Sequence, residues 1–218
     1  MEKRIYLLSP ALYEGTVSLP MIAFKTLSQT LQFENCDILM FTSKQAVISA
    51  EKINPEWKDT PCLAIGPATA RQIERLGAKV AYQPDTFYGK TLSQDIVKHF
   101  KEKKILYLRP KEVSFDSKGF LEKEGILIEE KVIYETQCIT YSEKNKPLKN
   151  AIIIFTSPST IHCFFKNFTW DESYTAVIIG KATEKHLPAY IHAVVADEAT
   201  IDACIEKAKV LCGEGCRE

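Results

Sequence analysis

Apolar runs alternate with helical patterns along most of this chain. Residues 36–41 form an apolar run typical of a buried strand, and Ser43 follows where a helix N-cap is expected. Apolar residues then recur at helical spacing as far as Ile53, and Asn54 and Pro55 are expected to end that helix. The pattern predicts a strand, a turn and a helix in succession.

The same alternation continues downstream. Further strands are expected over residues 62–65, 80–82, 105–108 and 127–128, and further helices over residues 68–76, 90–103 and 115–123. Strands that alternate with helices are typical of an α/β fold with a parallel sheet. This part of the chain therefore predicts five short parallel strands.

Two phrases of the sequence return at one shared offset of 114 positions. Phe-Thr-Ser at 41–43 recurs at 155–157, and Ile-Gly-Xaa-Ala-Thr at 65–69 recurs at 179–183. Solenoid repeats have periods of about 20–50 residues, so this much longer period indicates two similar domains instead. A cleft between two such domains is a favoured place for a ligand.

The N-terminal run, residues 4–10, is similar to residues 105–110 and is expected to join the sheet of the second repeat. The predicted fold is therefore two similar parallel-sheet α/β domains, one of them discontinuous, joined by a two-stranded antiparallel linker. The discontinuous domain takes residues 1–20 and 140–218, the inserted domain takes 24–134, and the hinge strands are 17–24 and 132–141. A single doubly wound sheet of about ten strands remains the alternative.

Composition narrows the class of protein. The 218 residues carry 28 basic and 28 acidic side chains, and 45% of them are apolar, as in an ordinary globular protein. A neutral chain binds a polyanion through individually placed donors, so nucleic acid is not expected as a partner. No apolar stretch of about 20 residues is present to span a membrane, and the start lacks a signal-peptide pattern. We expect a cytoplasmic protein.

Seven cysteines are scattered along the chain, at 36, 62, 138, 163, 204, 212 and 216. Most lie in apolar runs, so we expect free thiols that pack as small hydrophobic groups in a reducing compartment. Cys212 and Cys216 could form half of a metal site, but no second pair accompanies them. No metal is expected.

The repeated turns are the main candidates for binding. Each follows a strand and opens a helix, where free backbone N–H groups and the helix dipole favour an anion. The candidate binding residues are Thr42, Ser43, Gly66, Thr69, Thr156, Ser157, Ser159, Gly180, Lys181 and Thr183. The alternative is that the hydroxyls only cap their helices and that Lys181 is an ordinary exposed lysine.

Sequence motifs for other chemistries are missing. The chain has no dinucleotide fingerprint, no phosphate loop, no nucleophile elbow, and no metal-ligand spacing among its four histidines. Tyr134 lies in a predicted hinge strand, where one face of the strand is expected to look into the cleft, and a phenol can donate a proton. A packing role is the alternative for Tyr134.

Six phrases taken together resemble the uroporphyrinogen-III synthase family over nearly the whole chain. They are Phe-Thr-Ser-Xaa-Xaa-Ala-Val at 41–47, Ile-Gly-Pro-Ala-Thr-Ala at 65–70, Leu-Tyr-Leu-Arg at 106–109, Val-Ile-Tyr-Glu-Thr at 132–136, Phe-Thr-Ser-Pro-Ser at 155–159 and Ile-Gly-Lys-Ala-Thr at 179–183. Each phrase alone is weak, but their order and spacing are specific.

This resemblance implies a lyase of haem biosynthesis. Such an enzyme closes the linear tetrapyrrole hydroxymethylbilane to uroporphyrinogen III, with inversion of ring D and loss of water. The resemblance implies a monomer that needs no cofactor and whose partner is this octacarboxylate substrate. Tyr134 matches the hinge tyrosine of the family, a candidate general acid, and Ser43, Thr69, Ser157 and Thr183 match its binding turns.

The chain also departs from the family pattern. The segment after the first strand is shorter than the usual full helix, Lys181 stands where proline is common, and Ala182 stands where many members have a hydroxyl. Two other classes of function stay open at this point. One is a non-catalytic tetrapyrrole-binding or sensory module, and the other is a solute-binding protein, which the missing signal peptide disfavours.

Overall fold

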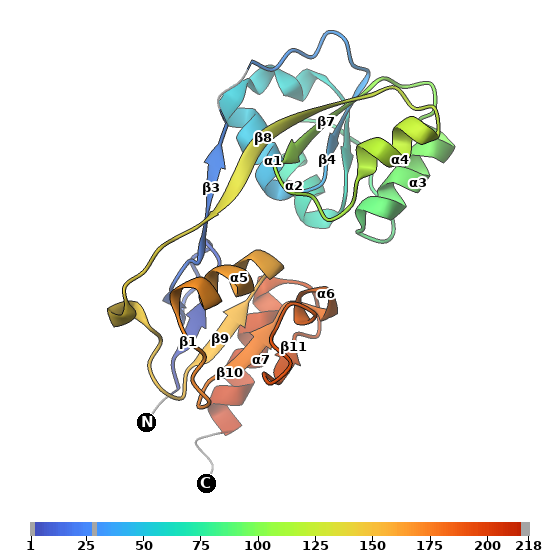
Figure 1. Ribbon diagram of the computed structural model, residues 1–218. Helices are drawn as coiled ribbons and strands as arrows, with labels where there is room; N and C mark the ends of the chain where they lie inside the picture. Colours follow the sequence, from blue (N-terminus) through green and yellow to red (C-terminus); the bar gives the residue numbers. More distant parts are fainter. Residues whose placement is uncertain (1–2, 28–29, 215–218) are drawn as a thin grey trace. The chain divides into compact units, whose positions relative to one another are not determined.

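The computed structural model describes residues 3–27 and 30–214. The chain divides into two compact units, Phe24–Thr136 and the pair of segments Met1–Ala23 and Gln137–Glu218. Each unit is built around its own sheet, with helices packed against it (Figure 1). Two separate sheets exclude the alternative of one continuous doubly wound sheet.

The sheet of the unit Phe24–Thr136 has the order β3-β8-β7-β4-β5-β6. Its strands are β3 (Ile22–Thr26), β4 (Ile38–Phe41), β5 (Cys62–Ala64), β6 (Val80–Tyr82), β7 (Ile105–Pro110) and β8 (Ile128–Cys138). The pairs β4–β5, β4–β7, β5–β6 and β7–β8 are all parallel, which confirms the five expected parallel strands. Its helices are α1 (Lys44–Ile53), α2 (Pro67–Arg75), α3 (Gly89–His99) and α4 (Ser117–Lys123).

The sheet of the other unit has the order β11-β10-β9-β1-β2, and its pairs are parallel. Its strands are β1 (Ile5–Leu7), β2 (Val17–Ser18), β9 (Ile152–Phe155), β10 (Thr175–Ile178) and β11 (Ala193–Val195), and its helices are α5 (Pro158–Asn167), α6 (Lys181–Glu184) and α7 (Ile201–Glu214). The expectation that the N-terminal run joins this sheet is confirmed, because Tyr6 pairs with Ile153.

Both faces of each sheet are covered by apolar side chains. In β4, Leu39 and Phe41 pack in one cluster, and Ile38 and Met40 pack in another. The strands β4 and β9 are buried at every position, as expected for parallel strands with helices on both faces. This burial explains why these strands read as continuous apolar runs in the sequence rather than as alternating patterns.

Two expected elements have different limits in the structure. The strand expected over 17–24 is instead two strands, because Pro20 lies between β2 and β3 and has no N–H to donate to a sheet. The helix expected over 90–103 ends at His99. Residues 101–104 are all charged, so they offer no apolar side chain to continue the buried face of that helix.

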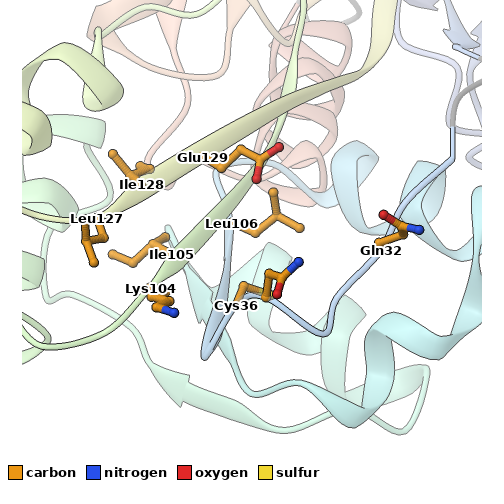
Figure 2. Close-up of a pocket in the computed structure, with 9 residues that line it drawn as sticks. Gln32, Cys36, Lys104, Ile105, Leu106, Leu127, Ile128 and Glu129 are labelled. Carbon is orange, nitrogen blue, oxygen red and sulfur yellow. The ribbon is translucent and has the colours of Figure 1, made fainter.

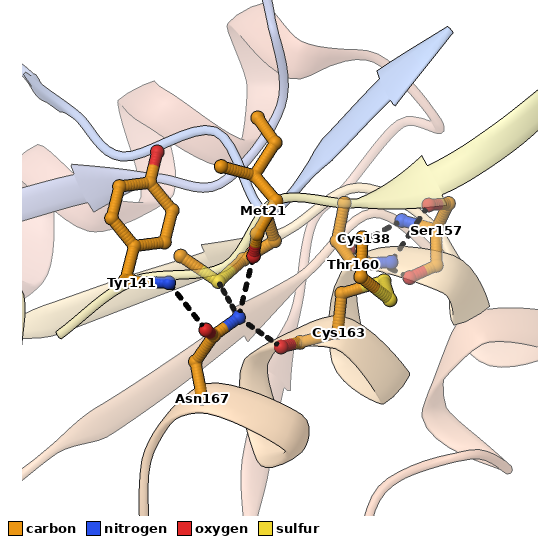
Figure 3. Close-up of a disulfide and its surroundings, with 8 residues drawn as sticks. Met21, Cys138, Tyr141, Ser157, Thr160, Cys163 and Asn167 are labelled. Atoms are coloured by element: carbon orange, nitrogen blue, oxygen red, sulfur yellow. Dashed lines mark hydrogen bonds between the residues drawn. A yellow bond between two sulfur atoms is a disulfide. The ribbon is translucent and has the colours of Figure 1, made fainter. Parts of the chain in front are cut away.

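The expectation of free thiols is wrong for Cys138 and Cys163, which form a disulfide with a Cα–Cα distance of 5.2 Å. Cys138 ends β8 and Cys163 lies in α5, so the bond ties this helix to the returning strand (Figure 3). Pairing of these two residues depends on the tertiary fold, which spacing alone does not reveal. Disulfides are uncommon in a reducing cytoplasm, so the compartment stays a prediction.

Asn167 strengthens the same attachment. Its amide group donates to the carbonyls of Ile139 and Cys163, each at 2.8 Å, and its Oδ1 accepts the backbone N–H of Tyr141 at 2.7 Å (Figure 3). The last turn of α5 is therefore hydrogen-bonded to the chain just beyond β8. The disulfide and two of these hydrogen bonds, those to Ile139 and Tyr141, attach α5 to the chain that leaves β8, whereas the bond to Cys163 lies within the helix.

We expect removal of this disulfide to lower the free energy of unfolding by about 2–4 kcal/mol, because the unfolded chain loses a cross-link that spans about 25 residues. The measurement is denaturant unfolding of the wild type with and without a dithiol reductant. The reductant should destabilise the wild type. It should also destabilise Cys36→Ala, which removes a free thiol and keeps the disulfide, but it should not change the stability of a Cys138→Ala/Cys163→Ala double variant. An unchanged wild type under reductant would contradict the assignment of the disulfide.

Candidate functional site

The candidate groups of each unit lie at the edge where its parallel strands end. In the unit Phe24–Thr136, Thr42 and Ser43 follow β4, and Gly66 follows β5 two residues after the last strand position. The ends of these strands are aligned, since Phe41 pairs with Ala64. Ligands of parallel sheets bind outside the carboxyl ends of the strands, so this edge is the candidate site.

Tyr134 reaches the same edge from β8. It pairs with Pro110, the last residue of β7, and its hydroxyl lies 2.9 Å from Ser43 Oγ. Ser43 is the N-cap of α1 and accepts the backbone N–H of Ala46 at 3.0 Å. The structure therefore brings together two residues that are 91 positions apart in the sequence and were both predicted for the site.

The environment of Tyr134 keeps its phenol protonated. The side chain is 4% exposed, and its ring meets that of Phe24 edge to face with centroids 5.8 Å apart. Burial raises the pKa of Tyr134, and the hydrogen bond with Ser43 partly offsets this rise. A phenol in this state is available as a proton donor at neutral pH, not as a base.

A second tyrosine, Tyr107 of β7, pairs with the neighbouring hydroxyl. Its phenolic oxygen lies 2.8 Å from Thr42 Oγ1, and its side chain is 2% exposed. Tyr107 packs in the cluster on one face of the sheet, and Tyr134 packs in the cluster on the other. The consecutive hydroxyls of Thr42 and Ser43 thus each meet a tyrosine from a different face.

Sequence analysis missed Tyr107. It lies inside an apolar run, Ile105–Leu108, where a tyrosine reads as a packing residue. A possible signal was its position near the carboxyl end of a strand that was itself expected in the parallel sheet. That position gives no information about its partner, which is 65 residues away.

Arg109, also in β7, has its donors engaged by the protein itself. It binds Glu130 through two hydrogen bonds of 2.8 and 2.9 Å, and it donates to the carbonyls of Pro110 and Lys111 at 2.8 and 2.9 Å. A guanidinium with these partners braces the chain that leaves β7. Its role in the structure is to hold this loop.

The turn after β5 offers backbone groups more than a side chain. Gly66 is the N-cap of α2 and forms no side-chain hydrogen bond there, while Thr69 in the first turn is only 3% exposed. A Cβ added at Gly66 would come within 3.0 Å of the Phe87 ring. Close packing therefore favours glycine at this turn, and the start of α2 leaves its N–H groups without a side-chain cap.

In the other unit the predicted residues also lie at two adjacent strand ends, because Phe155 of β9 pairs with Ile178 of β10. Ser157 caps α5 in a capping box: its Oγ accepts the Thr160 N–H at 3.3 Å, and Thr160 Oγ1 accepts the Ser157 N–H at 3.2 Å. The neighbours Thr156 and Ser159 are half-buried. Capping accounts for the hydroxyl of Ser157 in this structure.

The turn after β10 is less regular. Gly180 is the N-cap of α6, a helix of four residues, and it forms no side-chain hydrogen bond. Lys181 is exposed, which also fits the alternative that it is an ordinary surface lysine. Thr183, in contrast, is buried and only 5% exposed. The predicted residues thus gather at one sheet edge in each unit, with Thr42, Ser43, Gly66, Thr69 and Tyr134 in one unit and the others in the second.

A cavity of about 310 Å³ lies at the opposite edge of the sheet of the unit Phe24–Thr136 (Figure 2). It is lined by the starts of β7 and β8, at Ile105 and Ile128, and by Cys36. Burial raises the pKa of the Cys36 thiol to about 11, so this thiol is a poor nucleophile at neutral pH. The cavity provides none of the candidate chemistry found at the carboxyl edge.

Neither a metal cluster nor a membrane span is found within residues 3–27 and 30–214. No group of three or more His, Cys, Asp or Glu side chains there could hold a metal ion. Cys216, which was considered with Cys212, lies outside the described residues. No described helix is long and apolar enough to cross a membrane.

Comparison with known proteins gives the family. The model of the uroporphyrinogen-III synthase HemD family matches residues 14–206, which is most of the chain. The chain belongs to this family. Among curated protein sequences, none matches the chain significantly.

Solved structures agree with the family. The uroporphyrinogen-III synthetase from Helicobacter pylori 26695 is 25% identical with a TM-score of 0.79, over 96% of this chain and 99% of that one. A mutant uroporphyrinogen III synthase from the extremely thermophilic bacterium Thermus thermophilus is 11% identical with a TM-score of 0.60, over 98% and 99%. The second likeness supports the α/β fold alone.

The Ser43–Tyr134 contact can be tested by replacing Ser43 with alanine. We expect the free energy of unfolding to fall by about 1 kcal/mol through loss of the N-cap. We also expect the pKa of Tyr134 to rise further, because the hydrogen bond that lowers it is gone. The pKa can be followed by NMR of proteins labelled at the tyrosine ring, with Tyr134→Phe to assign the signal.

The matched control is Ser157→Ala, which removes an N-cap in the other unit and leaves Tyr134 in place. This control should lose similar stability without a change in the Tyr134 titration. Because the folded-state pKa of Tyr134 is raised, its contribution to stability is complete below about pH 10 and is lost as the pH rises through the folded-state value. An unchanged Tyr134 titration in Ser43→Ala would contradict the contact.

Proposed function

We propose that this protein is a uroporphyrinogen-III synthase, a lyase that closes hydroxymethylbilane to uroporphyrinogen III with loss of water and inversion of ring D. The observation that carries the proposal is the match of the HemD family over residues 14–206. We further propose that it acts in haem biosynthesis as a cytoplasmic monomer without a cofactor. These finer points rest on the family alone.

The proposal includes two domains joined by antiparallel strands β3 and β8. Two hydrogen bonds support it: Leu27 donates to Ile133, and Ile139 donates to Met21, each at 2.9 Å. As the residue number rises from Met21 to Leu27, the number of the bonded partner falls from Ile139 to Ile133. This opposite order is the one expected of an antiparallel pair. The cleft expected between the domains stays a prediction.

The helix starts and hydroxyls of the repeated turns are the proposed receptors for substrate carboxylates. Each helix start presents backbone N–H groups and the positive end of the helix dipole. The chain is neutral overall, so its affinity for an octacarboxylate must come from such placed donors. We assign binding to Thr42, Ser43, Gly66 and Thr69 in one unit and to Thr156, Ser157, Ser159, Gly180, Lys181 and Thr183 in the other.

Tyr134 is the proposed general acid. Its protonated phenol donates to the departing hydroxyl of the hydroxymethyl group, and Ser43 orients that phenol. The methylene carbon left behind is an electrophile, and the substituted carbon of ring D attacks it to give a spiro intermediate. Breakage of the older bond and closure at the free carbon then invert ring D, and the proton that this carbon loses on closure balances the one that the phenol gave to the departing water. The enzyme acts mainly by holding the chain folded.

The deciding experiment supplies freshly generated hydroxymethylbilane to the purified protein, oxidises the products and resolves the type I and type III porphyrins. We expect type III to predominate, since the uncatalysed closure gives the isomer without inversion. The control is the same reaction without protein. Only type I at the uncatalysed rate would contradict the proposal and leave a binding module.

Tyr134→Phe tests the general acid in the same assay. We expect kcat to fall by about a hundredfold or more, because a positioned acid contributes about 10²–10⁴-fold. Tyr82→Phe is the matched control, since its hydroxyl donates to Asp95 at 3.0 Å in the same unit and is unconnected to Ser43. An unchanged kcat in Tyr134→Phe would limit this tyrosine to a packing role.

A further inference from the structure

The disulfide between Cys138 and Cys163 joins two elements that carry residues proposed for the site (Figure 3). Cys138 is the last residue of β8, the strand that also contains Tyr134. Cys163 lies in α5, less than two helical turns after Ser157, the N-cap of that helix. One covalent bond therefore links the strand of the proposed general acid to the helix that opens at a proposed binding turn.

The last turn of α5 keeps its attachment when the disulfide is absent. Asn167 accepts the backbone N–H of Tyr141 and donates to the carbonyl of Ile139. Phe164, one helical turn earlier, is fully buried in the core cluster of the unit. These contacts do not depend on a bond between sulfur atoms, so we expect the reduced protein to stay folded with α5 formed.

The start of α5 depends more on the disulfide. Its capping box joins Ser157 to Thr160, and both of its hydrogen bonds lie within that first turn. They hold the shape of the turn but do not attach it to β8. Thr156, Ser157 and Ser159 are only half-buried. The covalent bond from Cys163 therefore supplies an attachment to β8 for this half of the helix.

The cysteine pair is placed to exchange with an external thiol. Cys138 is half-buried and follows the exposed residues Thr136 and Gln137, whereas Cys163 is 3% exposed. A thiolate of a dithiol reductant therefore attacks Cys138 Sγ and forms a mixed disulfide, and Cys163 Sγ leaves as a thiolate. The second thiol of the reductant then closes the disulfide of the reductant and releases Cys138. Two protons and two electrons pass in this way from the reductant to the pair.

Buried thiols elsewhere in the chain are poor competitors for this exchange. Burial raises the pKa of Cys36 and of Cys204 to about 11, and it raises the pKa of Cys62 to about 12. Each of these residues carries little thiolate at neutral pH, and the thiolate is the form that attacks a disulfide. The state of the Cys138–Cys163 pair is therefore set by reductants outside the protein rather than by these three thiols.

We propose that the Cys138–Cys163 pair is a redox switch that sets the affinity of the protein for its tetrapyrrole substrate. The oxidised pair holds the start of α5, with Ser157, to β8, and reduction by a dithiol loosens this turn and weakens substrate binding. The proposal rests on the synthase function proposed above and adds regulation to it. The covalent step is the thiol–disulfide exchange alone, and the cyclisation itself is unchanged.

The first test compares the oxidised and the reduced wild type in the assay for type III formation. We expect KM of the reduced form to be about three- to tenfold higher with little change in kcat, because the substrate must then order the loosened turn as it binds. Several ratios of reduced to oxidised dithiothreitol set the state of the pair, and alkylation with mass spectrometry measures the reduced fraction. KM should follow this fraction and return on reoxidation.

Two variants separate the switch from other effects of the reductant. The double variant Cys138→Ala/Cys163→Ala should have the KM of the reduced wild type in both conditions. Cys36→Ala, which keeps the pair, should respond as the wild type does. A cross-link that only stabilises the fold would change the melting temperature and leave KM equal. Equal KM in the folded oxidised and reduced wild type would therefore overturn the switch, while type III formation left the synthase function standing.

Amide hydrogen exchange tests the structural step without turnover. Reduction should speed exchange at Thr160 and Ile161, whose N–H groups bond to the Ser157 carbonyl at the start of α5. The start of α1 is the matched control, because it follows the same Phe-Thr-Ser phrase and that helix contains no cysteine. Unchanged exchange in α5 would overturn the loosening. If both redox forms give only type I, the synthase function falls, and the switch falls with it.

Discussion

Backbone pairing in parallel sheets forces the ends of neighbouring strands to one edge, and every candidate group in this protein depends on that constraint. Phe41 is held against Ala64 on one side and Leu108 on the other, so the residues that follow β4 lie beside those that follow β5 and beside the last two residues of β7. The same pairing in the other unit aligns Phe155 with Ile178. The repeated phrases mark these turns, which explains why a sequence repeat coincides with the proposed binding residues.

The alternation of side chains along an extended strand gives the two hydroxyls after β4 different surroundings. Thr42 turns toward the face that holds Tyr107, and Ser43 turns toward the face that holds Tyr134. Successive side chains of a strand point to opposite faces, so the two hydroxyls of one dipeptide can contact residues on both faces of the sheet. The Thr-Ser pair therefore contacts one tyrosine on each face of the sheet.

Sequence patterns predicted the strands and helices well because the central strands of both sheets are buried on both faces, which makes apolar runs and helical spacing easy to recognise. The repeat and the family resemblance singled out Tyr134 and the turns as candidates, and the functional roles of these residues stay predictions. Sequence patterns could not predict the Cys138–Cys163 bond or the Thr42–Tyr107 pair, since each joins residues that only the tertiary fold brings together. The strand expected over 17–24 was wrong because Pro20 interrupts pairing at a point where the apolar pattern continues.

A neutral protein that handles an octacarboxylate faces a specific physical problem. A strongly basic surface would attract the substrate but would hold all its acidic side chains alike, whereas isomer selectivity requires one folded arrangement of four rings. Hydroxyls and helix starts act over short distances and in fixed directions, so each can hold one carboxylate at one place. Arg109 illustrates how a charge serves the scaffold instead, because its guanidinium is bound to Glu130 and holds the chain that leaves β7.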